Sequence, residues 1–271
     1  WSAFALPFVW YKMINSNKRK LLFVFLNIFF MFVLFMTKAR TTTAILIGEI
    51  VLFLVFALLK GNKEYCKKIV YLIVCVTTVF SLSLGFLGIT QNKNIGVFTY
   101  LNDNLLTIVQ SGARSNGARF ATIYADFQIF RENPISGVGI GLTPGYMPEK
   151  FPLHAMQNSE VRNWIRYQNE QGILKSGIPS FSEFSRLLAE VGIIGFLLFF
   201  LPVVVLYWQY MKKLKMLTME EMTVVIALTG MLATGFSNSL NITYCYWVLM
   251  GLGYSLCIGI LDTKNSKMNV N

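Results

Sequence analysis

Three arginines are placed where they could hold an anion. Arginine stays charged at physiological pH and can bind two acceptor oxygens at once through its planar set of N–H donors. Arg40 lies just before an apolar run that we expect to be helical, and the free N–H groups of a helix N-terminus add to anion affinity. Arg114 and Arg119 lie together in a glycine-rich basic turn. The plainer alternatives are that Arg40 only snorkels or sets topology, and that Arg119 is a solvated residue of a first helical turn.

Three other side chains could accept a proton from a hydroxyl group. Glu183 lies at the start of a long apolar run, and His154 is the only histidine in the chain. Asp126 follows Arg119 by seven residues, so the two lie near one helix face. Each also has a plainer alternative: a helix N-terminal acid for Glu183, a solvated loop residue for His154 and a structural ion pair for Asp126.

The sequence contains no pattern that is typical of a metal or nucleotide site. It has no Asp-x-Asp, and its four cysteines do not form a cluster with the histidine. The run Gly137-Val138-Gly139-Ile140-Gly141 lacks the Lys-Ser/Thr of a phosphate-binding loop, so we expect it to serve tight backbone packing. We therefore predict chemistry that needs no metal and no cofactor.

The composition places these residues in a membrane protein. The chain is 55% hydrophobic and 14% charged, whereas soluble domains carry about 25% charged residues. The apolar residues form blocks of roughly 16–20, which is about the length of a membrane-crossing helix. The fold class we predict is an all-α polytopic membrane protein, a multi-helix transmembrane bundle with a large helical extracytoplasmic loop.

The net charge of +11 comes largely from basic residues in the loops of this bundle, so we do not take it as a sign of a nucleic-acid site. Basic residues cluster in alternate short loops, which is the pattern of cytoplasmic loops. They are Lys12, Lys18, Arg19 and Lys20; Lys60, Lys63, Lys67 and Lys68; and Lys212, Lys213 and Lys215. Anionic membrane lipid is a further partner that such loops can contact.

The apolar blocks and charges predict six helices in three parts of the chain. The helices span residues 21–36, 42–59, 69–87, 187–210, 222–236 and 242–261. Residues 1–87 form transmembrane helices, residues 88–186 an extracytoplasmic loop domain, and residues 187–271 transmembrane helices and a cytoplasmic tail. Because the chain starts at Trp1 with a short apolar run, we expect that first helix to be the end of a longer one.

Two further features carry expectations. Glu49 lies midway along the predicted helix 42–59, where an ionised acid costs about 2.5–3.5 kcal/mol, so we expect it to face the interior, paired or protonated, and to line a cavity. In the outer loop the spacing of Phe120, Ile123, Phe127 and Phe130 predicts one apolar face of a helix, which Asn133-Pro134 ends.

Three short runs of sequence resemble the O-antigen polymerase and ligase family. The first is Gly117-Ala118-Arg119, then Asn133-Pro134 and the run Gly137-Val138-Gly139, and the spacing from Arg119 to Pro134 is that of the family pattern. The second is Leu187-Leu188-Ala189-Glu190-Val191-Gly192, and the third is the turn Thr37-Lys38-Ala39-Arg40. They occur in the family's order over residues 37–200.

The resemblance implies an enzyme of glycan assembly, similar to C-type glycosyltransferases. The substrate it implies is a polyprenyl-pyrophosphate-linked glycan, and the place is the extracytoplasmic face of the bacterial inner membrane. Arg40, Arg119 and Arg114 would then bind the diphosphate, and Glu183 or His154 would be the base. A chain-length regulator and a flippase of the same pathway are the protein partners that it implies.

One departure from the family pattern separates the alternatives. Ligases of the family usually carry His-Asn just before the second run, and this chain has Phe181 and Ser182 there. The departure favours a polymerase of lipid-linked repeat units over a ligase that moves the glycan to a lipid, wall or protein acceptor. A transporter of the lipid-linked unit is the third alternative, but it would carry its charges along an intramembrane path.

Overall fold

The described part of the protein is entirely helical apart from its connecting turns. The structure is a computed structural model that describes residues 2–16, 18–36, 40–60, 66–67, 69–79, 116–238, 240 and 244–268. Within these ranges no residue forms a strand, which confirms the prediction of an all-α chain. The chain divides into two compact units: Trp1–Leu106 with Val205–Ala233 and Tyr244–Asn271, and Thr107–Val204 with Thr234–Thr243.

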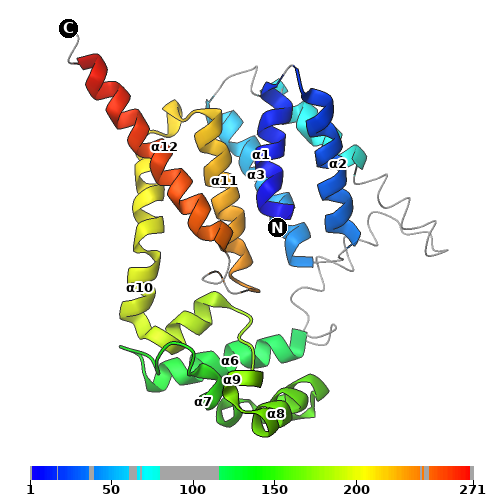
Figure 1. Cartoon of the computed structure of the whole chain (residues 1–271), viewed down its shortest axis with the longest axis vertical. Coiled ribbons are helices and arrows are strands. Elements are labelled where there is room, and N and C mark those ends of the chain that lie inside the picture. The colour runs from blue at the N-terminus through cyan, green and yellow to red at the C-terminus, as the bar shows by residue number, and fades with distance from the viewer. Residues whose placement is uncertain are drawn as a thin grey trace, which may run out of the picture. The chain divides into compact units, whose positions relative to one another are not determined.

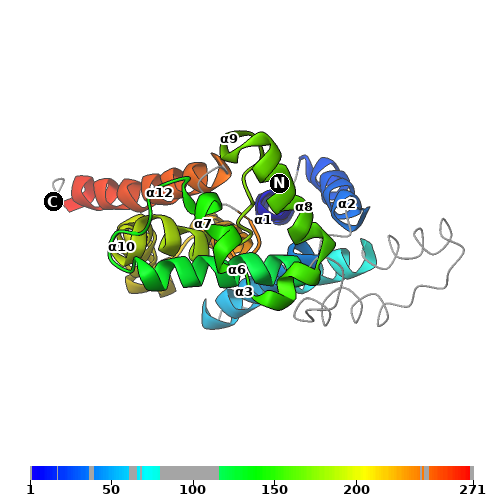
Figure 2. The ribbon, with the colours of Figure 1, turned by 90° about the horizontal axis from the view of Figure 1, so that it is seen from below.

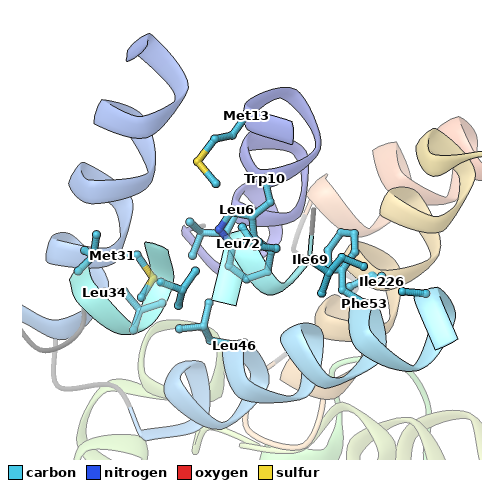
Figure 3. Close-up of a cluster of buried hydrophobic side chains, with 13 residues drawn as sticks. Leu6, Trp10, Met13, Met31, Leu34, Leu46, Phe53, Ile69, Leu72 and Ile226 are labelled. Atoms are coloured by element: carbon cyan, nitrogen blue, oxygen red, sulfur yellow. The ribbon is translucent and has the colours of Figure 1, made fainter. Parts of the chain in front are cut away.

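The first unit is made of apolar helices. It contains α1 (Ser2–Asn15), α2 (Lys20–Met36), α3 (Arg40–Lys60), the helical stretch Ile69–Val79, the end of α10 (Glu183–Lys212), η3 (Leu214–Met216), α11 (Met219–Thr234) and α12 (Tyr244–Met268). The helix α1 lies beside α2 (Figure 1). Trp10 lies in the core of this unit, edge-on to Phe53 at 5.9 Å between ring centroids (Figure 3). Its indole nitrogen donates to Asn27 Oδ1 at 2.9 Å, so the one polar atom of this large side chain is satisfied inside the apolar cluster.

Two described helices are long and apolar enough to cross a membrane, Thr41–Lys60 and Glu183–Lys212. Only 33% and 22% of their most apolar windows are buried, so neither behaves as the core helix of a soluble protein. Leu58, Leu197 and Val204 on these helices are each more than half exposed. Continuous exposed apolar surface of this kind is typical of helices that face lipid. The predicted helices are present at these positions, and those at 21–36 and 222–236 are found as α2 and α11 within a few residues. The helix predicted at 242–261 is α12, which ends seven residues later. Residues 69–79 of the helix predicted at 69–87 are helical, and residues 80–87 lie outside the described residues.

The second unit is a small helical domain whose core combines alanines with larger apolar side chains such as Met147 and Phe151. It contains α6 (Asn116–Glu132), α7 (Thr143–Lys150), η2 (Leu153–Gln157), α8 (Ser159–Gln171), α9 (Ile173–Ser176) and the start of α10. The helix α7 lies beside α6 (Figure 2). The buried amide of Gln168 donates to the carbonyl of Pro144 at 2.8 Å and accepts from the N–H of Ile178 at 2.9 Å. This single side chain therefore ties α7 and the segment before α10 to α8.

The helix α6 is present as predicted, but its apolar phenylalanine face is not the face that packs. The buried residues of α6 are Ala118, Ala121, Thr122, Ala125, Asp126 and Ile129. Phe120 and Phe127 are each more than 40% exposed. The reason is steric: alanine and threonine let the α6 backbone approach the other helices of the unit closely, and the bulky rings are turned away.

The glycine run after α6 packs backbone against backbone on α10, as the sequence predicted. The N–H of Val138 donates to Ala189 O at 2.9 Å, and the N–H of Gly139 donates to Glu190 O at 2.8 Å. A Cβ at Gly137, which has φ +66°, would collide with the main chain of Glu190. Hence only glycine fits at this close approach.

The helix predicted for residues 187–210 is longer, and it is broken. At Gly192 the backbone has φ 64° and ψ −169°, which no helix contains. The break frees the N–H of Ile193, which donates to Pro134 O at 2.8 Å. The segment before the break carries Glu183, Arg186 and Glu190, and the about 20 residues after it are long enough to cross a hydrocarbon core of ~30 Å. The sequence prediction missed this break because hydropathy does not report backbone angles.

Candidate active site

Arg119 lies in the first turn of α6, where its guanidinium group lies against an aromatic ring and has no ion-pair partner among the described residues. Its guanidinium carbon is 5.0 Å from the centroid of the Phe181 ring, and that ring packs on Trp164 at 5.6 Å. The buried Nε of Arg119 has no hydrogen-bond partner among the described residues. A buried donor normally has a partner, because leaving it without one costs about 1–3 kcal/mol. An arginine in this condition is suited to bind an anion.

Asp126 lies two turns further along α6 and is fully buried. Its Oδ2 accepts from the hydroxyl of Ser180 at 2.5 Å and from that of Ser185 at 2.7 Å. Its Oδ1 has no hydrogen-bond partner in the described part of the chain, and no described cation forms an ion pair with it. Burial raises the pKa of Asp126 to about 7, although the two serine hydroxyls act in the opposite direction. A carboxyl group with such a pKa can take up or release a proton near neutral pH.

Glu183 begins α10 and is bound to Arg186. Its two carboxylate oxygens accept from Arg186 Nη2 at 2.7 Å and 2.8 Å, and Oε2 accepts from Nε at 3.1 Å. Arg186 Nη1 also donates to Glu190 Oε2 at 2.7 Å. The three side chains thus form one ion-pair network on the first turns of α10, and their backbone is anchored where the N–H of Glu183 donates to Gly235 O at 2.8 Å. In this arrangement Glu183 orients a guanidinium group.

His154 lies in η2 on the edge of a cavity of about 400 Å³. Phe120 and Tyr124, one turn apart on α6, line the same cavity, as does Asn158 at the N-terminus of α8. These α6 residues lie on a different face of the helix from Asp126. His154 is therefore near the start of α6 but is separate from the serine–aspartate cluster.

Of the remaining predicted residues, Glu49 lies in the first unit and two arginines are not fully described by the structure. Arg114 and the side chain of Arg40 lie outside the described residues. The helix α3 begins at Arg40, two residues earlier than predicted, so Arg40 is at the helix N-terminus. Glu49 is buried in the first unit, as predicted for an intramembrane acid. Both of its carboxylate oxygens lack a hydrogen-bond partner among the described residues, and it lies against Gly230 of α11, where a side chain would collide with it.

Metal ligands do not gather in the part of the chain that the structure describes, where no three His, Cys, Asp or Glu side chains are close enough to hold an ion. Metal independence stays a prediction.

Sequence reasoning did not find Ser180, Ser185 or Arg186. The acid–base spacing of Glu183, Arg186 and Glu190 at three and four residues was a usable signal, because such residues are neighbours on a helix. The serines gave no signal, since they are more than fifty positions from Asp126 in the chain.

Comparison with known proteins bears on the same stretch of chain. A family model described as O-antigen ligase matches residues 23–200, about two thirds of the sequence. This range includes most of α2, the whole of α3 and α6, and the break in α10. No curated protein and no solved structure gives a significant match. Since the family match covers well over half of the sequence, the chain belongs to the O-antigen ligase family.

Proposed function

We propose that this protein is a multi-pass enzyme of the bacterial inner membrane that polymerises lipid-linked glycan repeat units on the extracytoplasmic face. The observation that carries the proposal is the pairing, in one small unit, of an arginine with a buried unpartnered N–H and an aspartate that can titrate near pH 7. A transfer from a polyprenyl diphosphate needs these two functions: a cation for the leaving group and an acceptor for a proton. Membership in the O-antigen ligase family supports a role in glycan assembly.

In this proposal Arg119 binds the diphosphate as it leaves. Charge develops on the leaving oxygen as the bond to the sugar breaks, and a fixed guanidinium stabilises that charge. The Phe181 ring lies 5.0 Å from the guanidinium carbon and restrains this cation through a cation–π contact. Arg40 and Arg114 remain our further candidates for the other diphosphate oxygens.

The proton of the attacking hydroxyl goes to Asp126 through Ser180. The acceptor oxygen bonds to the anomeric carbon, and the bond from that carbon to the diphosphate breaks with its electron pair on the diphosphate. The hydroxyl proton passes to Ser180 Oγ while Ser180 gives its own proton to Asp126 Oδ2, 2.5 Å away. Ser180 is half-buried whereas Asp126 is fully buried, so the serine is the group that a substrate can reach. We prefer this pair to Glu183, whose oxygens are occupied by Arg186, and to His154, which lies on another face of the unit.

Phe181 supports polymerisation over ligation. It stands where related ligases usually carry their histidine, and its ring packs on Arg119 and offers no proton acceptor there. Ligation stays the second candidate, because the description of the matching family is O-antigen ligase.

The experiment is a comparison of arginine variants in cells of the host at matched protein levels. We expect Arg119→Ala to accumulate single repeat units in place of polymer, with a loss of about ten- to a hundred-fold or more in rate, since a charge-assisted hydrogen bond contributes about 1.5–3 kcal/mol. Arg119→Lys should recover only part of the activity, because lysine keeps the positive charge but cannot bind two acceptor oxygens at once through a planar set of N–H donors. Arg131→Ala, an exposed arginine at the other end of α6, is the control. Normal polymer from Arg119→Ala would remove this residue from the site.

A further inference from the structure

The cavity beside α6 has the lining of a binding site for an uncharged polar molecule. Its volume of about 400 Å³ is in the range of small-molecule sites. None of its lining side chains is Asp, Glu, Lys or Arg. A diphosphate would therefore find no fixed countercharge there, and the ligand must be recognised by apolar contact and neutral hydrogen bonds.

The polar groups at this cavity are free to bind such a ligand. In the described part of the chain, neither the Tyr124 hydroxyl nor the His154 imidazole has a hydrogen-bond partner, and the same is true of the Asn158 amide nitrogen. Asn158 uses only its oxygen, which accepts from the N–H of Glu160 at 2.8 Å. Both aromatic rings on α6 are also more than 40% exposed, so their faces are available for contact.

A sugar ring combines the two properties that this lining requires. Its C–H face is apolar and packs on aromatic rings, while its hydroxyl groups donate and accept hydrogen bonds around the edge. We propose that the cavity binds one sugar ring of the glycan substrate, at a distance from the bond that reacts. This inference rests on the proposed function, in which Arg119 holds the diphosphate. Arg119 lies near the face of α6 that carries Asp126, whereas Phe120 and Tyr124 lie on a different face. The ring in the cavity is therefore one that lies away from the diphosphate along the glycan.

The test measures binding separately from turnover. The probe is a one-repeat oligosaccharide released by mild acid from the host's own polysaccharide, titrated into the purified full chain by calorimetry. We expect Tyr124→Ala to weaken binding about ten-fold and Tyr124→Phe about three-fold, because the second variant loses only one hydrogen bond. Phe127→Ala is the matched control: it removes an equally exposed aromatic ring from the same helix but outside the cavity.

Kinetics identify which glycan occupies the cavity and what His154 does. If the sugar ring in the cavity belongs to the acceptor, Tyr124→Ala should raise the KM for the single repeat unit. If that sugar ring belongs to the donor, Tyr124→Ala should raise the KM for the carrier-linked chain. His154→Gln should raise the same KM and keep kcat, whereas a base would lose kcat.

The experiments distinguish an error in the sugar-binding proposal for the cavity from an error in the proposed function. Unchanged binding by both Tyr124 variants, or no binding by the unmodified protein, would overturn the inference even if polymer is made. Arg119→Ala should bind the oligosaccharide normally while losing turnover. Normal turnover in that variant, with binding still lost on Tyr124→Ala, would reject our assignment of Arg119 and keep the cavity.

Discussion

Replacing Asp126 by asparagine removes a buried titratable group and keeps its shape. Burial raises the pKa of Asp126 from its ordinary value of 3.8 to about 7. Each pKa unit corresponds to about 1.36 kcal/mol. Relative to the unfolded chain, the folded state therefore favours the neutral carboxyl over the ionised one by ~4 kcal/mol. This preference contributes stability that is fully present below pH 3.8, where the folded and unfolded chains are both protonated. It is lost as pH rises through about 7, because the unfolded chain ionises first.

The asparagine variant should therefore be less sensitive to pH and more stable in alkali. An amide cannot ionise, so the variant loses the contribution of Asp126 to the slope of the free energy of unfolding against pH between pH 4 and 7. At pH 8 the variant keeps the ~4 kcal/mol that the unmodified protein loses to ionisation. The buried amide N–H₂ group that replaces an oxygen costs about 1–3 kcal/mol where it finds no partner. We therefore expect a net gain in the free energy of unfolding of about 1–3 kcal/mol. Polymer formation should nevertheless fall by about 10²- to 10⁴-fold, the usual contribution of a general base.

The assay is thermal unfolding of the purified protein at pH 5 and pH 8, together with polymer formation in cells. Glu132→Gln is the control, because Glu132 lies on the same helix but is exposed and pairs with Lys150 at the surface. Parallel Tm curves against pH for the Asp126→Asn variant and the unmodified protein would refute the burial argument. Full polymer from Asp126→Asn would refute its role as proton acceptor.

Three other outcomes follow from the structure and the sequence. Gly137→Ala should lower the Tm by the equivalent of ~2 kcal/mol or more, because its Cβ meets backbone and its φ is positive, whereas Gly141→Ala, with open space around it, should cost only the ~1–2 kcal/mol of the positive φ. Polymerisation in isolated membranes should survive a strong chelator, and loss that added Mg²⁺ restores would show a metal requirement. Cysteine at position 158 should react with an impermeant reagent in intact cells and cysteine at 63 should not, and the reverse pattern would invert the topology.

The sequence predicted the helices well because their signal is local. The blocks at residues 21–36 and 42–59 are continuous apolar runs, and α2 and α3 match them within a few residues. The expectation of tight packing at Gly137 also held, since a glycine run without a phosphate-binding pattern has few other uses. The site was less accessible to this reasoning.

What the sequence could not provide were contacts between distant residues and the choice of a buried face. Asp126 meets Ser180 and Ser185 only after α6 has packed on the start of α10. The phenylalanines of α6 gave the stronger periodic signal, yet the alanines packed, because close approach of helices favours short side chains. Phe181 was recognised as a departure from the family pattern, but its contact with Arg119 was not.

The most direct measurement of the central claim uses the purified full chain in proteoliposomes with a lipid-linked repeat unit as its only substrate. Products would be resolved by length, and free polyprenyl diphosphate would be counted. Our account predicts polymer with one polyprenyl diphosphate released for each linkage formed, and loss of both products together in Arg119→Ala and Asp126→Asn. Movement of the intact repeat unit across the bilayer, with neither linkage nor released diphosphate, would contradict it.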